Sequence, residues 1–446
     1  MEVLKHWLES RKTDDNSILL LLIQGYFYLT VLCFIILILP VSQLSENTVV
    51  DQIFFAVSIV STTGLVPSDF GSSYNMFGQI VSLLFIQLGG IGYMALITFI
   101  VLKRFDKLPR LSARLLKQEF HLPQKYPLLS FIYSVIIFTL IFEIIGAIVL
   151  YFGFRNAGVE NPVWNAIFHS VSAFCTAGFS LFGDSMSSFK GNSLITTTIL
   201  ILSLLGSIGF IVLLDFWMKF LKHRKTITLT SKIILFSTFL FWIVGSFMIF
   251  FSDTTLMGNG WNGLKIAAFQ SISAHTTVGF NNYDISAISP GGIYIMIILM
   301  IIGASPAGTG GGIKTTSITA IIAVLLSVLR RRNRITFFSK EIPTSNIYLA
   351  ISSALFYVFI MSVGLWLLLL TDGAAIEFEE LLFEASSALS TVGISTGITG
   401  DLSDQGKLII ASLMFIGRLG VLTFGFALMN KAPLLRNKPK SEDIAI

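Results

Sequence analysis

A pattern of four residue types occurs four times along this chain of 446 residues. In each copy serine stands four positions after phenylalanine, threonine eight and glycine ten. Backbone carbonyls of such a stretch can replace the hydration shell of a cation, and glycine adopts angles that other residues avoid. We therefore predict an ion-selectivity filter made of Thr62, Thr63, Gly64, Thr176, Ala177, Gly178, Thr277, Val278, Gly279, Thr391, Val392 and Gly393.

The segments that must position these residues are too short to cross a bilayer. Each has about a dozen residues before its glycine, whereas a spanning helix needs about 20. We expect each segment to enter and leave on the outer side, with a short helix pointing its negative end at a common axis. The alternative, that the glycines mark only tight outer turns, leaves the accompanying phenylalanine, serine and threonine unexplained.

Composition places the chain in a membrane. Hydrophobic residues make up 54% and charged residues 12%, and the mean hydropathy is +0.81. A soluble domain carries roughly 25% charged residues. We predict an all-α membrane protein with eight transmembrane helices, arranged as four span–pore-loop–span repeats around one central pore. The expected spans are Ile18–Leu39, Phe77–Leu102, Leu128–Phe152, Ser193–Met218, Lys232–Phe251, Gly292–Leu329, Ile347–Thr371 and Lys407–Met429.

The expected organisation has four repeats between two tails. Basic residues gather in alternate loops, which by the positive-inside rule places both termini in the cytoplasm and the protein in the cell membrane. These short loops suit contact with lipid rather than nucleic acid. The boundaries are a cytoplasmic N-terminus at 1–16, repeat 1 at 17–105, repeat 2 at 106–222, repeat 3 at 223–340, repeat 4 at 341–430 and a cytoplasmic C-terminal tail at 431–446.

The sixth span is too long for one helix and has a centre that cannot stay helical. A straight helix over 292–329 would be roughly 57 Å long, and Pro306 and several glycines interrupt it. We expect a broken helix whose loop lies beneath the filter. A phosphate-binding loop is the competing interpretation, but Ile313 stands where that motif needs glycine. The loop residues are Gly303, Ala304, Ser305, Pro306, Ala307, Gly308, Thr309, Gly310, Gly311, Gly312 and Lys314.

Arg418 occupies the position of Gly90, Ser207 and Ala304 in the other repeats. A charge deep in a span is costly and usually faces a cavity or a partner. It either tunes ion passage beneath the filter or belongs to a buried structural ion pair. Glu143, within the third expected span, is a candidate partner for a cation that the sequence does not identify.

Other chemistry has little support. Cys33 and Cys175 lie far apart and suggest no disulfide or metal site, and we expect His169 and His275 to be packed or hydrogen-bonded. An enzyme is not expected, since the acids near span interiors do not form one site. A secondary carrier remains the alternative from another transport class, although carriers commonly show two inverted repeats.

The fourfold pattern resembles the Trk/Ktr/HKT superfamily of cation transporters, most of all a Ktr-type (KtrB-like) potassium uptake subunit. The resemblance covers nearly the whole chain. It implies that the filter glycines are Gly64, Gly178, Gly279 and Gly393, and that four glycines favour potassium. It also implies that the loop of the sixth span is the gate, and that Arg418, a position where relatives also carry arginine, belongs to it.

The resemblance also implies a function and partners. The function is potassium uptake across the plasma membrane by a channel-like pore, with a sodium-permeable or ion-coupled secondary cation transporter as the alternative. The implied partners are a second copy in a homodimer and a cytoplasmic KtrA/KtrC-like ring. Nucleotide would bind only on that regulatory subunit. No covalently bound cofactor is implied, and sodium dependence stays open.

Overall fold

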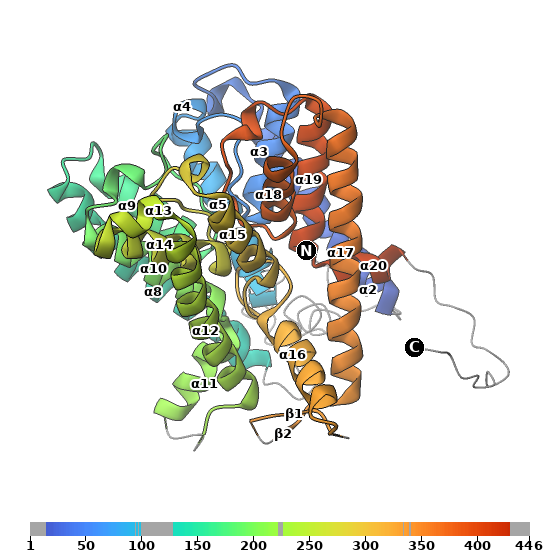
Figure 1. Ribbon diagram of the computed structural model, residues 1–446. Helices are drawn as coiled ribbons and strands as arrows, with labels where there is room; N and C mark the ends of the chain where they lie inside the picture. Colours follow the sequence, from blue (N-terminus) through green and yellow to red (C-terminus); the bar gives the residue numbers. More distant parts are fainter. Residues whose placement is uncertain are drawn as a thin grey trace.

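The computed structural model describes residues 15–93, 95–96, 98–99, 128–221, 226–332, 334–338 and 340–428. Most of this part is helical (Figure 1). The expectation of a helical membrane protein is confirmed. The expected basic segments near the N-terminus, between repeats 1 and 2 and in the C-terminal tail lie largely outside the described residues.

Four long apolar helices are each sufficient to cross a membrane. They are α2 (Asp15–Leu37), α8 (Leu128–Asn156), α12 (Leu229–Ser252) and α17 (Thr344–Thr371). Their mean hydropathy is 2.3 to 2.6. Large side chains on them remain exposed, for example Ile144 at 57% and Leu355 at 68%. Such surfaces suit lipid, where an apolar side chain has no reason to be buried.

Each long helix is followed by a shorter one that ends near a Thr-x-Gly stretch. These helices are α3 (Val49–Ser61), α9 (Pro162–Phe174), α14 (Gly260–Thr276) and α18 (Phe378–Leu389). Thr48 begins α3 with a capping box, in which its hydroxyl accepts from Asp51 N–H and the Asp51 carboxylate accepts from Thr48 N–H. Small elements lie beside them: α4 (Phe70–Ser73), α13 (Thr254–Gly258), and the 3-10 turns η1 (Pro40–Ser42), η2 (Ser187–Phe189), η3 (Ile285–Ala287) and η4 (Ile398–Gly400).

The return helices all begin at a polar cap. They are α5 (Met76–Ile91), α10 (Ser193–Ile208), α15 (Pro290–Ile302) and α19 (Asp404–Leu419). Their capping side chains, which accept from backbone N–H groups of the first turn, are Asn75, Asn192, Ser289 and Ser403. The same local chemistry therefore starts the return limb in every repeat.

Every return limb is broken, and not only the sixth span for which the sequence predicts a broken helix. Helix α5 ends at Gly92, and α10 meets α11 (Phe210–Phe220) at Gly209 with a 90° bend. Helix α19 meets α20 (Val421–Leu428) at Gly420. The three glycines have φ of +83° to +92°, which residues with a side chain rarely adopt. Helix α15 is separated from α16 (Thr315–Leu329) by the expected loop.

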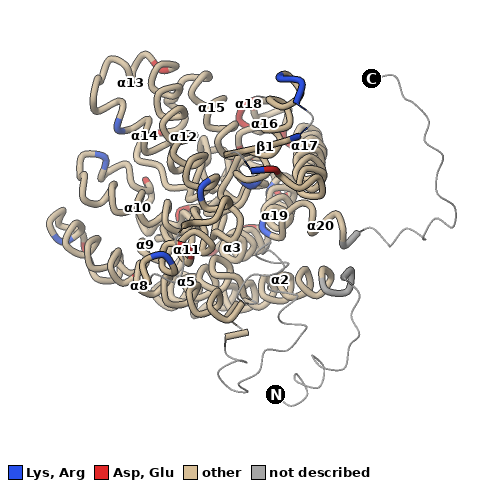
Figure 2. The backbone as a smooth tube through the Cα atoms, turned by 90° about the horizontal axis from the view of Figure 1, so that it is seen from below, with Lys and Arg blue, Asp and Glu red and all other residues tan. Residues whose placement is uncertain are grey.

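The repeats follow one another around the molecule. Seen from below, α2–α5, α8–α10, α12–α15 and α17–α20 occupy successive sectors (Figure 2). An ion pair closes the circle, since Lys407 Nζ on α19 lies 2.8 Å from Asp51 Oδ1 on α3. The strands β1 (Thr336–Phe337) and β2 (Lys340–Glu341) form an antiparallel pair after α16, with Thr336 opposite Glu341.

Candidate ion-conduction site

The four short helices end in one shared hydrogen-bond pattern. In repeat 1, Thr62 N–H donates to the Ile59 carbonyl at 3.1 Å and Thr63 N–H donates to the Ser58 carbonyl at 2.9 Å. These two bonds define a Schellman motif, which usually places glycine at the left-handed position. The equivalent bonds from the residue after threonine run from Ala177 to Ser172, Val278 to Ser273 and Val392 to Ser387.

Threonine occupies the left-handed position in every copy. The φ angles are +52° at Thr62, +50° at Thr176, +58° at Thr277 and +50° at Thr391. A β-branched residue there is a genuine outlier that costs on the order of 1–3 kcal/mol. All four threonines are fully buried. Because strained backbone tends to persist where function requires it, this recurrence marks the four turns as one site.

The glycines of the four stretches lie against one another in a closed ring. A Cβ added to Gly64 would overlap the Ala177 carbonyl oxygen, and one on Gly178 would overlap that of Val278. A Cβ on Gly279 would overlap the Val392 oxygen, and one on Gly393 would overlap the Thr63 oxygen. A Cβ added to any of the four would also lie only 3.0–3.2 Å from the Cα of the next glycine. The structure therefore brings together the four predicted filter glycines and the residues that precede them.

A glycine near the end of three return helices lets each of these helices approach the short helix of its own repeat closely. A Cβ on Gly89, Gly206 or Gly417 would overlap the carbonyl oxygen of Val60, Phe174 or Leu389 respectively. Each of those oxygens lies at the C-terminal end of the short helix of the same repeat. The negative ends of three helix dipoles are thus packed closely against the return helices beside the ring.

The loop between α15 and α16 is docked on the ring and on the break of repeat 2. Ser305 N–H and Oγ donate to the Ser207 carbonyl at 3.2 and 2.6 Å, and Thr309 N–H donates to that of Gly206 at 3.1 Å. Phe210 N–H donates to the Ala307 carbonyl at 2.9 Å. The broken α10–α11 limb therefore supplies the anchor for this loop.

Two ring threonines bond to the loop and two do not. Thr176 Oγ1 donates to Thr309 Oγ1 at 3.0 Å, and Thr277 Oγ1 accepts from Gly311 N–H at 3.0 Å. The hydroxyls of Thr62 and Thr391 are buried without a hydrogen-bond partner among the described residues. Among the four left-handed threonines, the loop thus bonds only to the hydroxyls of Thr176 and Thr277, which belong to repeats 2 and 3.

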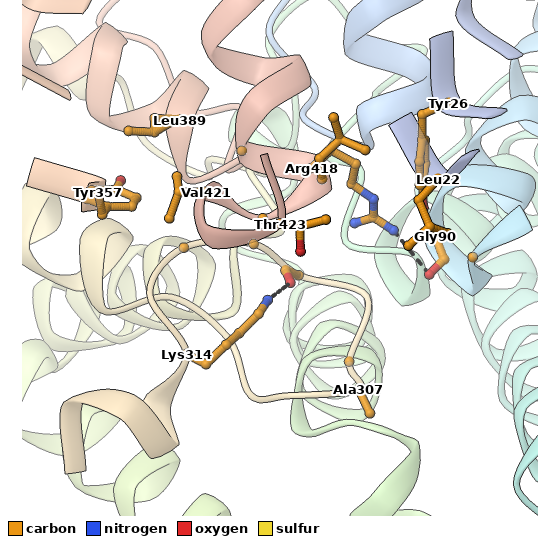
Figure 3. Close-up of a pocket in the computed structure, with 18 residues that line it drawn as sticks. Leu22, Tyr26, Gly90, Ala307, Lys314, Tyr357, Leu389, Arg418, Val421 and Thr423 are labelled. Atoms are coloured by element: carbon orange, nitrogen blue, oxygen red, sulfur yellow. Dashed lines mark hydrogen bonds between the residues drawn. The ribbon is translucent and has the colours of Figure 1, made fainter. Parts of the chain in front are cut away.

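Two cationic side chains reach the same loop (Figure 3). Lys314 Nζ donates to the Gly310 carbonyl at 2.7 Å. The Arg418 guanidinium donates to the carbonyls of Thr309 and Gly89, and to that of Gly90 at 3.3 Å. Both line a cavity of about 90 Å³ together with loop glycines and Tyr26 of α2.

The ion-pair alternative for Arg418 finds no carboxylate partner among the described residues. Glu143 instead accepts from Gln87 Nε2 at 2.9 Å, and the Cys175 thiol lies 3.7 Å from its other oxygen. The expectation for His169 is confirmed, since Nδ1 lies 2.7 Å from the Asn165 carbonyl and the ring stacks on Phe182. His275 packs against Phe241.

Sequence reasoning missed that Gly92, Gly209 and Gly420 end or bend the return helices. The signal was present, because a second glycine recurs in QLGGIGY, LLGSIGF and FIGRLGV. Within the described residues there is no group of three or more histidine, cysteine and acidic residues that could hold a metal ion.

Comparison with known proteins gives a consistent result. Residues 35–433 match the family model TrkH, described as "Cation transport protein". The Ktr system potassium uptake protein B of Vibrio alginolyticus is 31% identical over 411 residues, which cover 91% of this chain and 90% of that protein. Its namesake from Bacillus subtilis is also 31% identical, over 90% of this chain and 91% of its own length.

Two further matches extend the comparison. The potassium/sodium uptake protein NtpJ of Enterococcus hirae is 31% identical over 92% of this chain and 93% of its own length. The crystal structure of the potassium transporter TrkH from Vibrio parahaemolyticus superposes with a TM-score of 0.73 at 19% identity, covering 94% of this chain and 86% of that one. This likeness supports the fold.

Proposed function

The chain belongs to the TrkH family of cation transport proteins, and we propose that it takes up potassium across the plasma membrane through one channel-like pore. The observation that carries the proposal is the closed ring, in which each Thr-x-Gly glycine lies against a backbone carbonyl of the next copy. Relatives at 31% identity are named as potassium uptake proteins.

The ring has the chemistry of a selectivity filter. Four copies of the same strained turn supply backbone oxygens that can replace the water around a cation. Four helix C-termini end beside it, and their partial negative charges favour a cation there. The residues that would hold potassium are those of the four Thr-x-Gly stretches.

The loop at 303–314 is the proposed gate. It lies against the threonine ring and occupies the space where an ion leaving the filter would pass. Arg418 and Lys314 hold its carbonyls from two sides, and their charges oppose a cation in the same space. Displacement of the loop would open the path.

The proposed topology has eight membrane crossings. The long helices α2, α8, α12 and α17 supply four, and the broken return limbs α5, α10–α11, α15–α16 and α19–α20 supply the other four. Within the boundaries 17–105, 106–222, 223–340 and 341–430, each repeat then places its ring turn at membrane depth. Both tails, 1–16 and 431–446, would lie in the cytoplasm.

Partners follow from the relatives. The names of the relatives assign them to a Ktr system, which implies a further subunit. We propose a homodimer of this chain on a cytoplasmic ring of nucleotide-binding regulatory subunits. Potassium is the transported substrate rather than a resident cofactor.

A sodium-permeable or sodium-coupled function is the second candidate. It is favoured by one observation, the relative named as a potassium/sodium uptake protein. Potassium complementation of an uptake-deficient strain, with and without a regulatory subunit and with and without sodium, separates these functions. Growth at low potassium is expected. Absence of growth with a correctly inserted protein, or rescue only of sodium uptake, would contradict the first proposal.

A further inference from the structure

The repeated serine has no role in the filter proposed above, although it occurs in every copy of the pattern. Its four members, which we call the brace serines, are Ser58, Ser172, Ser273 and Ser387. All four are fully buried. Their carbonyls accept the closing bonds of the Schellman motifs, so their side chains lie at the last turn of each short helix.

The hydroxyl of every brace serine bonds to the backbone just beyond the threonine. Ser58 Oγ accepts from Gly64 N–H at 3.1 Å, and Ser387 Oγ accepts from Gly393 N–H at 3.0 Å. In the two middle repeats, the hydroxyls donate instead to the carbonyl after the glycine. Ser172 Oγ donates to Phe179 at 2.8 Å, and Ser273 Oγ donates to Phe280 at 2.5 Å.

We propose that the brace serines are positioning residues that set the orientation of the filter peptides, and that they do so in two ways. The inference rests on the proposed filter. A trans peptide is planar, so its N–H and C=O point in opposite directions. The Gly64 N–H shares a peptide with the Thr63 carbonyl. A bond from that N–H to Ser58 therefore fixes Thr63 oxygen on the side of the ring, where it contacts Gly393.

The same argument applies to repeat 4 and differs for repeats 2 and 3. Ser387 fixes the peptide whose carbonyl, that of Val392, contacts Gly279. Ser172 and Ser273 instead hold the peptide two positions further along, whose carbonyl belongs to the residue after the glycine and is turned to the helix. The peptide between Phe280 and Asn281 is bonded on both sides. Its carbonyl accepts from Ser273 Oγ, and its N–H donates to Ser185 Oγ at 3.3 Å. The four repeats are thus held in two ways, with repeats 1 and 4 alike and repeats 2 and 3 alike.

Neighbouring serines on the same helices show that burial alone does not produce these bonds. Ser386 is also fully buried, but its hydroxyl donates to the Leu382 carbonyl one turn back. Ser271 is buried too and donates to the Trp242 carbonyl of α12 at 3.0 Å. Each lies within two residues of a brace serine and is bonded away from the filter. They are matched controls.

The test compares Ser387→Ala with Ser386→Ala, and Ser273→Ala with Ser271→Ala. The full-length protein is purified and reconstituted, and tracer uptake of rubidium and of sodium is measured beside the thermal stability. Loss of one hydrogen bond of ordinary strength should change the sodium-to-rubidium ratio about two- to tenfold. The two controls should keep the ratio of the unchanged protein.

The outcomes separate this inference from the filter on which it rests. Ratios for both brace variants equal to those of their controls would overturn the inference. Failure of both brace variants to fold, while both controls fold, would assign the serines to folding and overturn it as well. Gly393→Ser is the reference variant. If its sodium-to-rubidium ratio is also unchanged, the proposed filter is wrong. If the ratio changes in Gly393→Ser but not in the two brace variants, only the role of the brace serines is rejected.

Discussion

The carbonyl oxygen of Thr63 lies against the Cα of Gly393, so that a side chain on this glycine would overlap it. This contact joins the first repeat to the last. The three other contacts of the ring join successive repeats, and each likewise pairs a glycine with the residue before the next glycine. The filter proposed here therefore depends on four positions that exclude side chains.

Substitution of a ring glycine should impair selectivity. Gly64 has φ of +93° and no room for a Cβ, so Gly64→Ser should displace the neighbouring carbonyl and raise sodium permeation relative to potassium. Flux assays in proteoliposomes measure the ratio. Gly158→Ser is the control, since Gly158 also has a positive φ (+74°) but nothing within 4 Å of a Cβ. Unchanged selectivity in Gly64→Ser would count against the filter.

Removal of Ala304–Gly310 should increase cation flux. The deletion takes away the segment that bonds to Thr176 and packs beside Thr277, and it also removes the oxygens held by Lys314 and Arg418. Tracer uptake per reconstituted protein is the measurement. Thr309→Ala is a milder variant that loses two hydroxyl bonds, to Thr176 and to the Phe174 carbonyl. Lower flux in a folded deletion variant would make the loop structural.

Arg418→Ala should change transport more than assembly, because the guanidinium binds the carbonyls of Thr309 in the loop and Gly89 in α5, and no carboxylate among the described residues. We expect raised basal flux with an unchanged oligomeric state by size-exclusion chromatography. Arg418→Lys should recover only part of the control of flux, since an ammonium cannot bind two carbonyls in the planar geometry of a guanidinium. Loss of assembly at unaltered flux would support a structural role.

The left-handed backbone of the four threonines should lower the free energy of unfolding while supporting ion selectivity. Thr391→Gly relieves the strain of a β-branched residue at φ +50° and should raise the free energy of unfolding, or leave it unchanged, while altering ion selectivity. Thr391→Val keeps the branched shape and the strain but lacks the hydroxyl. If the hydroxyl acts on the ion, both variants change selectivity. If Thr391→Gly is strongly destabilising and selectivity is normal, the strain argument is wrong.

The Asp51–Lys407 ion pair should make stability depend on pH. Burial raises the pKa of Asp51, but hydrogen bonds from Lys407 and Thr48 and the Lys407 charge outweigh it, so the pKa lies below its usual value. Because the pKa of Asp51 is lower in the folded than in the unfolded protein, the pair stabilises the fold fully at pH values above the unfolded pKa of about 3.9. This stabilisation is lost as the pH falls through the folded pKa. Thermal melts from pH 7 to 3 should show this loss, and Asp51→Asn should abolish it.

High salt provides the control for this pair. Both side chains are mostly buried, with exposed fractions of 14% for Asp51 and 12% for Lys407, so screening should weaken the pair less than it weakens the exposed pair Arg334–Glu341. A melting profile of Asp51→Asn that follows the unchanged protein at every pH would show that the pair contributes nothing.

Much of the architecture was predictable because apolar length and the fourfold pattern are local signals. The long helices begin and end near the expected bounds, and the loop of the sixth span lies where proline and glycine interrupt the helix. The break at Gly209 was not predicted, because a glycine inside an apolar run looks the same whether it packs or bends. The loop contacts that need this bend come from residues about 100 positions further along, such as Ser305.

The hydrogen-bond partners of the buried charged residues could not be predicted from the sequence either. A sequence shows that Arg418 and Glu143 are costly in a span, but not which group satisfies them. The structure gives Arg418 backbone oxygens from two other repeats and gives Glu143 the amide of Gln87. Backbone partners leave no trace in residue identity, so an arginine bonded to carbonyls cannot be distinguished in advance from an arginine in an ion pair.

The contact between Thr63 and Gly393 also constrains how the protein can be made. During synthesis the Thr-x-Gly stretches of repeats 1 to 3 emerge long before that of repeat 4. The ring of glycines therefore stays open on one side until repeat 4 has been made. Pairing of the two ends of so long a chain is a slow, non-local step. An unfinished chain therefore lacks the closed ring, and a ribosome that stalls before residue 393 leaves the proposed filter incomplete.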